Sequence, residues 1–190
     1  MIEREKKMLI SKEDYEILME HYGRDNDSNL KPIVKQVNYY FDTDDFLMNS
    51  QNTTCRIRLK NGKYSATLKQ HSNGSDLSTE TDMEIFDGLT DNAFTVMGLK
   101  LQGKLITYRC IVFRNTHCEV ALDKNEYLGC EDYELEVEYE DMFAQDAERI
   151  IREITDLFNI ETPHNISFSK SHRFFEKKSR LTVKSIFDVT

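Results

Sequence analysis

The chain has 190 residues, of which 39% are apolar and 31% are charged, so it is long and apolar enough to bury one compact core. Its formal net charge of −9 argues against unspecific binding to nucleic acids or anionic membranes, because both depend on a basic surface. The sequence has no run of about 18 apolar residues and no signal-peptide pattern, which predicts a soluble, cytoplasmic protein without a membrane anchor.

Alternation of apolar and polar residues with period two recurs along the chain and predicts mostly β-strands. The predicted strands cover residues 2–10, 34–42, 55–60, 63–69, 79–86, 104–114, 117–123, 133–139 and 166–174. Between the third and the fourth of these, Asn61-Gly62 is typical of a type I′ hairpin turn.

Three segments have the periodicity of helices instead. The first follows Ser11, which begins a capping-box sequence; the second covers residues 90–97 and ends before Gly98; the third covers residues 144–159. We interpret the apolar stripes of these helices as packing surface. Three helices among about nine strands predict an α+β protein whose antiparallel sheet is curled or closed into a barrel.

The cysteines and histidines give no sign of a metal centre. The four cysteines lie far apart without CxxC spacing, and the five histidines lack the spacing of zinc ligands. We therefore expect buried, reduced thiols at Cys55, Cys110, Cys118 and Cys130.

The charged faces of the predicted strands are sorted by sign. Residues 133–139 place three glutamates on one face, and residues 55–60 place three cations on one face. These rows are Glu134, Glu136 and Glu138, and Arg56, Arg58 and Lys60. Like charges in a row repel each other, so the rows favour a polyvalent ligand, with carboxylates holding divalent cations and the basic row meeting phosphate oxygens.

The alternative is a sheet whose charged rows face solvent, as in most antiparallel sheets with one wet side. If the rows point inward, each unpaired ion in a dry interior costs several kcal/mol, whereas a whole domain is stable by only about 5–15 kcal/mol. Inward rows therefore predict a wide, water-filled barrel with helices over its apolar outer face.

Several short motifs follow one another in an order that resembles the CYTH superfamily, also called triphosphate tunnel metalloenzymes. They are Glu3-Arg4-Glu5-Lys6-Lys7, Tyr39-Tyr40-Phe41-Asp42-Thr43, Arg56-Ile57-Arg58, Thr67-Leu68-Lys69, Thr79-Glu80, Arg109, Asp123, Glu134-Leu135-Glu136-Val137-Glu138 and Ser169-Lys170. The chain looks closest to the small bacterial members, and the resemblance covers residues 1–175 as one domain, leaving residues 176–190 as a C-terminal tail.

The resemblance implies a closed tunnel of eight antiparallel strands, with helices outside, that binds a small-molecule triphosphate with Mg²⁺ or Mn²⁺. The implied substrate-binding residues are Lys7, Arg56, Arg58, Lys69, Arg109 and Lys170. The implied metal ligands are Glu3, Glu5, Glu80, Asp123, Glu134, Glu136 and Glu138, and the row 134–138 leaves open which two of its glutamates bind metal. The implied catalytic residues are Glu5, Lys7, Arg58 and Glu136.

Such a site neutralises charge on phosphate oxygens and aligns a nucleophile, which is what phosphoryl transfer requires. We expect hydrolysis of inorganic triphosphate by a monomer or homodimer that has no nucleic-acid partner. Adenylate cyclase activity would use the same residues, although it requires an adenine pocket that the sequence does not identify. Two further functions also fit them: hydrolysis of thiamine triphosphate, with aromatic recognition by Tyr39, Tyr40 or Phe41, and non-catalytic binding of polyphosphate or a nucleotide.

Overall fold

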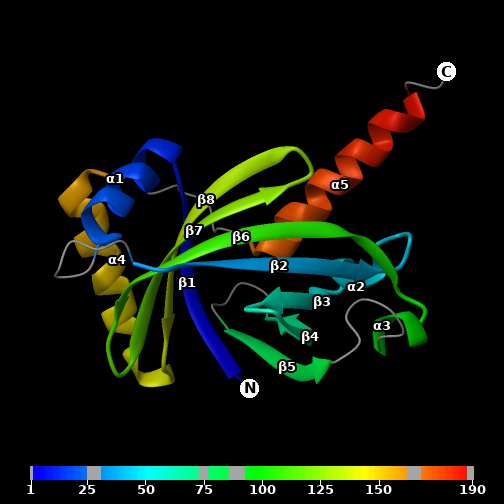
Figure 1. Ribbon diagram of the computed structural model, residues 1–190, viewed down its shortest axis with the longest axis horizontal. Coiled ribbons are helices and arrows are strands. Elements are labelled where there is room, and N and C mark those ends of the chain that lie inside the picture. Colours follow the sequence, from blue (N-terminus) through cyan, green and yellow to red (C-terminus); the bar gives the residue numbers. More distant parts are fainter. Residues whose placement is uncertain (1, 25–30, 73–76, 86–92, 162–167, 188–190) are drawn as a thin grey trace.

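Eight antiparallel strands close into a barrel with the strand order β1-β5-β4-β3-β2-β6-β7-β8 (Figure 1). This computed structural model describes residues 2–24, 31–72, 77–85, 93–161 and 168–187, without the side chains at positions 3, 83–85, 93 and 183–187. The α+β fold with a closed eight-stranded barrel, expected from the sequence, is confirmed.

The strands agree with eight of the nine predicted segments. They are β1 (Ile2–Ile10), β2 (Ile33–Asp42), β3 (Thr53–Lys60), β4 (Lys63–His71), β5 (Leu77–Ile85), β6 (Lys100–Arg114), β7 (Cys118–Tyr127) and β8 (Cys130–Tyr139). Asn61 and Gly62, between β3 and β4, have φ values of 52° and 76°, as a type I′ turn requires of both central residues.

The helices lie outside the barrel or at its end. They are α1 (Lys12–Tyr22), α2 (Leu47–Ser50), α3 (Ala93–Val96), α4 (Ala144–Phe158) and α5 (Lys170–Phe187), and a short 3₁₀ turn (Asp141–Phe143) precedes α4. Ser11 caps α1, since its hydroxyl accepts a hydrogen bond from the Asp14 amide at 3.0 Å. The predicted helix over residues 90–97 is present as α3, and residues 90–92 lie outside the described residues.

The prediction of a strand over residues 166–174 is wrong where the structure describes it, because α5 begins at Lys170. Phe168, Lys170, His172 and Phe174 alternate as in a strand, but the buried side chains are those of Ser171, Arg173, Phe174 and Phe175, of which the first and the last two have helical spacing. A segment this short fits both the strand period of two residues and the helix period of 3.6 residues. The helix then continues through residue 187 and projects away from the barrel (Figure 1).

The outer face of the barrel carries the main apolar core. Helices α1 and α4 cover β1, β7 and β8 (Figure 1). Leu18 and Ile154 pack there against Leu135, Val137 and strand neighbours. A second outer cluster places Ile57 and Cys55 of β3 with Phe94 of α3. All four cysteines are free thiols; Cys55, Cys110 and Cys118 are buried as predicted, whereas Cys130 is only half-buried.

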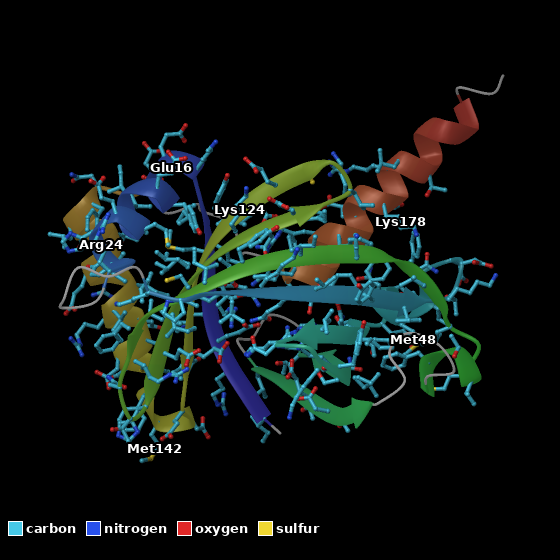
Figure 2. All side chains as sticks on the ribbon, in the orientation of Figure 1. Glu16, Arg24, Met48, Lys124, Met142 and Lys178 are labelled. Carbon is cyan, nitrogen blue, oxygen red and sulfur yellow. The ribbon has the colours of Figure 1, made fainter. Side chains whose placement is uncertain are left out.

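The start of α5 occupies one end of the barrel interior. Phe174 and Phe175 pack against Tyr40 of β2 and Leu105 of β6. Gly103 of β6 permits this close approach, because its φ is +148° and a Cβ atom would lie 2.8 Å from the Phe174 ring. Farther along the helix, Lys178 lies beside β6 and donates a hydrogen bond to the Gln102 side chain at 2.9 Å (Figure 2).

Among the helices of the described residues, none combines the length and the apolar character that crossing a membrane requires.

Candidate active site

Inward-facing side chains enclose a cavity of about 80 Å³, which has room for several water molecules. Its lining includes six cations and four carboxylates, from six of the eight strands and from the start of α5. These are Lys7, Arg56, Arg58, Lys69, Arg109 and Lys170, and Glu5, Glu80, Glu136 and Glu138. The charged rows therefore point inward, except that Lys60 at the end of β3 is exposed and does not line the cavity.

The cavity is narrower than the wide, water-filled interior expected from the sequence. Ion pairs, and not water alone, offset most of the cost of burying these charges, since acidic and basic side chains one or two strands apart in the sheet reach each other. Lys69, for example, lies 3.0 Å from Glu80 and 3.6 Å from Glu5.

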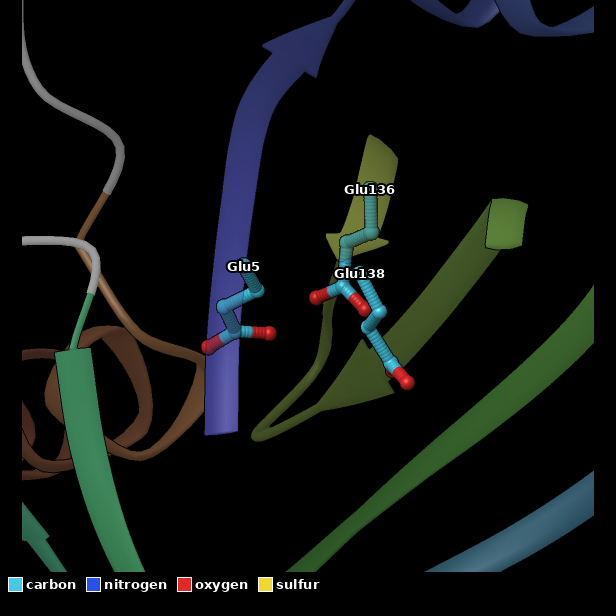
Figure 3. Close-up of side chains that lie close together, drawn as sticks. All are labelled: Glu5, Glu136 and Glu138. Atoms are coloured by element: carbon cyan, nitrogen blue, oxygen red, sulfur yellow. The ribbon is translucent and has the colours of Figure 1, made fainter. Parts of the chain in front are cut away.

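Three carboxylates, from β1 and β8, gather at one side of the cavity (Figure 3). Oxygen atoms of Glu5, Glu136 and Glu138 lie within 4.8 Å of one another, because Glu5 pairs in register with Glu138 across the two strands. Burial opposes ionisation of Glu5, but Lys7 and Lys69 outweigh it and lower its pKa to about 2. Burial raises the pKa of Glu138, and Glu136 and Glu5 act in the same direction against Arg109.

A second carboxylate cluster consists of Asp123, Glu134 and Glu136, all buried. The ammonium group of Lys170 lies among them, 2.9 Å from Asp123 and 2.8 Å from Glu134, and it also contacts Glu136. The three acids raise the pKa of Lys170 well above its ordinary value despite burial. A lysine cation thus stands where these acids could otherwise surround a metal ion.

Arg109 of β6 joins the two carboxylate clusters. Its Nε and Nη2 donate to the two oxygens of Asp123 at 2.9 and 2.7 Å, Nη1 donates to Glu138 at 3.0 Å, and Nη2 also contacts Glu136. These acids raise the pKa of Arg109 despite burial. Arg109 is the counterion of these acids before any ligand binds.

Two arginines of β3 are less well balanced. Arg56 contacts Glu80 at 3.2 Å, yet its buried Nε has no hydrogen-bond partner in the described part of the chain. Arg58 donates from Nε to the Asn38 side chain at 2.8 Å and forms no ion pair with any described residue. Burial, together with Arg56 and Arg109, lowers the pKa of Arg58 to about 10. Of the two, Arg58 is the one whose charge no carboxylate of the described residues balances.

Uncharged polar groups line another part of the cavity, next to the start of α5. The Thr54 hydroxyl lies 3.2 Å from His71 Nε2 and 2.7 Å from the Ser171 hydroxyl, which is 3.0 Å from the Ser169 hydroxyl. Burial, and Lys69 nearby, lower the pKa of His71 to about 4, so this histidine is neutral at pH 7.

The structure brings the sequence-predicted site residues together in and around one cavity, except for Glu3, whose side chain lies outside the described residues. Asp123 and Glu134 lie just behind the lining and hold Lys170. Sequence reasoning missed several lining residues, namely Gln36, Thr54, His71, Thr107 and Ser171, and it offered Tyr40 only as an aromatic alternative. Those on strands lie on the same face as the charged rows. Extending the alternation of each strand by two residues would therefore have identified them.

Comparison with known protein families gives the same assignment as the motifs in the sequence. The family model of the CYTH domain matches residues 1–175. The chain belongs to the CYTH domain family. Helix α5 of this CYTH protein runs through residue 187, so it extends past the matched region.

Similar sequences and similar structures are known. "Putative triphosphatase YjbK" of Bacillus subtilis is 29% identical over 79% of this chain and 84% of its own length. A structure named a putative adenylate cyclase, from Bacillus halodurans, is 29% identical, with a TM-score of 0.68 over 91% of this chain and 97% of the other. The structure of "Putative adenylyl cyclase HpAC1" from Hippeastrum is 18% identical, with a TM-score of 0.71 over 92% and 96% of the two chains, and shows likeness of fold.

Proposed function

We propose that this CYTH protein hydrolyses inorganic triphosphate with the help of Mg²⁺ or Mn²⁺. The main support is that Arg58, a partly buried cation, has no carboxylate partner among the described residues. The other cations of the cavity are largely paired. An unbalanced buried cation is costly, and a bound anion removes that cost.

The charge of the cavity supports a polyanionic substrate. Its lining has six cations against four carboxylates, although the whole chain has a net charge of −9. Arginine binds phosphate oxygens through its planar fork and lysine binds them as a point charge. A flexible chain of phosphates can contact cations on several strands at once, whereas a single carboxylate ligand could not.

The oxygen cluster of Glu5, Glu136 and Glu138 fits a hard divalent cation, because Mg²⁺ and Mn²⁺ prefer carboxylate oxygens. A metal held there would neutralise charge on the phosphate oxygens and promote attack by water. Lys170 already fills the second cluster, so we assign Asp123 and Glu134 to holding Lys170 and not to metal binding. We likewise assign Glu80 to pairing with Lys69 and Arg56, and not to metal binding.

The remaining residues of the site would hold the substrate in line for hydrolysis. Arg56 and Arg58 would bind phosphate oxygens from β3, while Lys7 and Lys69 approach from β1 and β4. On binding, Lys69 and Arg56 would exchange contacts with Glu80 for contacts with phosphate. Preorganised cations of this kind stabilise the charge that develops on the departing phosphate group.

Adenylate cyclase activity requires a slot for adenine as well as a triphosphate site. Among the described lining residues Tyr40 has the only large aromatic ring, and that ring packs against Phe174 of α5. The name of the Bacillus subtilis relative, a triphosphatase, agrees with the simpler reaction, as does the triphosphatase activity stated for the Hippeastrum protein. We therefore favour hydrolysis over cyclisation.

A turnover screen tests the proposal. Purified protein is incubated with inorganic triphosphate, ATP or thiamine triphosphate, with Mg²⁺ or Mn²⁺, and both orthophosphate and cyclic AMP are measured. We expect orthophosphate from inorganic triphosphate as the fastest reaction, and none in excess chelator. Faster cyclic AMP formation from ATP, faster cleavage of thiamine triphosphate, or tight triphosphate binding without turnover would each contradict it.

A further inference from the structure

Arg173 of α5 uses every hydrogen-bond donor of its guanidinium group inside the protein. Nε and Nη2 donate to the two oxygens of Asp132 at 2.9 and 3.2 Å, and Nη1 and Nη2 donate to the two oxygens of Glu134 at 3.2 and 3.0 Å. The remaining Nη1 donor reaches the Phe168 carbonyl at 2.5 Å. Because a guanidinium group has five N–H donors, none is left for a phosphate.

The two acids that receive these bonds both belong to β8, and the side chain of Arg173 is only 9% exposed. Two bidentate contacts determine the orientation as well as the distance of the bound groups. Arg173 thereby joins the first turn of α5 to one strand of the barrel. The Phe168 carbonyl, just before the helix, is held by the same group.

Glu134 connects this contact to the cavity. The oxygen of Glu134 that accepts from Arg173 Nη2 also lies 2.8 Å from Lys170 Nζ. Lys170 and Arg173 are three residues apart and so lie on the same face of the helix. Lys170 in turn contacts Glu136, one of the three carboxylates assigned to the metal.

We propose that Arg173, acting through Asp132 and Glu134, is a positioning residue that holds Lys170 in the active site. A lysine side chain is long and flexible, so its ammonium group stays in place only where its backbone and its partners are held. Arg173 supplies both, since it anchors the first turn of α5 and orients the Glu134 carboxylate. The inference rests on the proposed triphosphatase activity, because Lys170 lines the cavity and contacts Glu136 of the proposed metal cluster.

A double-mutant cycle separates positioning from plain stabilisation. The variants are Arg173→Lys, which keeps the charge but loses the fork, Lys170→Ala, and the two combined. The readouts are KM and kcat for inorganic triphosphate with Mg²⁺, and the thermal midpoint of each variant. We expect Arg173→Lys to lower kcat/KM about tenfold in the parent chain, but by less than about twofold in the Lys170→Ala background.

Arg180→Lys is the matched control, because Arg180 lies on the same helix, is 74% exposed and pairs only with Glu176 among the described residues. It should leave kcat/KM unchanged. If Arg173→Lys does not fold, Asp132→Asn enters the same cycle with the same expected result, since it removes one of the two acids and leaves Glu134 in place.

Equal losses of kcat/KM in both backgrounds, or no loss in either, would overturn the positioning role while the parent enzyme remains active. A parent chain that neither binds nor cleaves inorganic triphosphate would instead overturn the proposed function, and this inference with it.

Discussion

At the scale of single residues, the site is a set of balanced and unbalanced charges. Arg109 and Lys170 are surrounded by acids, whereas Arg58 has only an amide oxygen as partner among the described residues. Residues of the same type in the same cavity therefore differ in their role. We expect the balanced cations to organise the carboxylates and Arg58 to meet an anionic substrate.

Replacing Arg58 tests this distinction. Arg58→Ala removes charge-assisted hydrogen bonds to phosphate, each contributing about 1.5–3 kcal/mol, so triphosphate affinity should fall about ten- to a hundredfold. The fold should survive, because the change removes one of two neighbouring cations. Calorimetric titration with triphosphate measures the affinity, and Arg114→Ala, at an exposed arginine of β6, serves as the control. Unchanged affinity in Arg58→Ala would refute its role.

His71 should make the folded state sensitive to acid. Its pKa is lowered to about 4 in the fold by burial and by Lys69, whereas an unfolded chain has the ordinary value of about 6.5. Below pH 6.5 the unfolded state therefore binds the proton more readily, and the contribution of His71 to stability declines as the pH falls from about 6.5 to 4. His71→Asn should flatten the dependence of the thermal midpoint on pH in this window. Parallel profiles for the two proteins would contradict the assignment.

At the scale of elements, alternate residues of each strand face two different environments, the charged interior of the barrel and its outer face. On β3, Arg56 and Arg58 line the cavity, while Ile57 between them packs outward against Phe94 of α3. The helices α1, α3 and α4 cover apolar faces, and α5 enters the barrel from one end. Alternate residues of one strand thus line the cavity and pack in the outer apolar core.

The outward face of β3 should not tolerate charge. Ile57 is 0% exposed, so Ile57→Asp buries a carboxylate without a partner and should lower the free energy of unfolding by more than about 3 kcal/mol. Leu68→Asp is a matched control, since Leu68 faces outward on β4 but is 40% exposed. Urea unfolding compares the two. Similar losses in both variants would show that burial is not the cause.

At the scale of the whole molecule, an acidic protein encloses a cavity whose lining has more cations than carboxylates. Barrel closure brings β1 beside β8, which creates the cluster of Glu5, Glu136 and Glu138 from residues more than 130 positions apart. A ligand that bridges these strands also ties the two ends of the sheet together. Metal binding should therefore be visible in global stability.

Saturating Mg²⁺ or Mn²⁺ should raise the free energy of unfolding. At a metal concentration of about 100 times Kd, linkage predicts an increase of about 2.7 kcal/mol, which a thermal unfolding series with added metal detects. Glu136→Gln should lose this increase, whereas Glu148→Gln, at a half-exposed acid of α4, should keep it. An equal metal effect in the Glu136→Gln variant would exclude the proposed cluster as the metal site.

The sequence by itself determined the strands, the outer helices and the face on which each charged row lies, because a period of two or 3.6 residues is a local property. The order of its motifs also identified the candidate site residues, through their resemblance to the CYTH superfamily. Only the tertiary structure decided which acid surrounds Lys170 and which gathers with Glu5, since Glu134 and Glu138 share one face of β8 and differ in what lies opposite them. It likewise decided that residues 170–174 are helical, because their alternation fits both periods and burial against Tyr40 and Leu105 favours the helix.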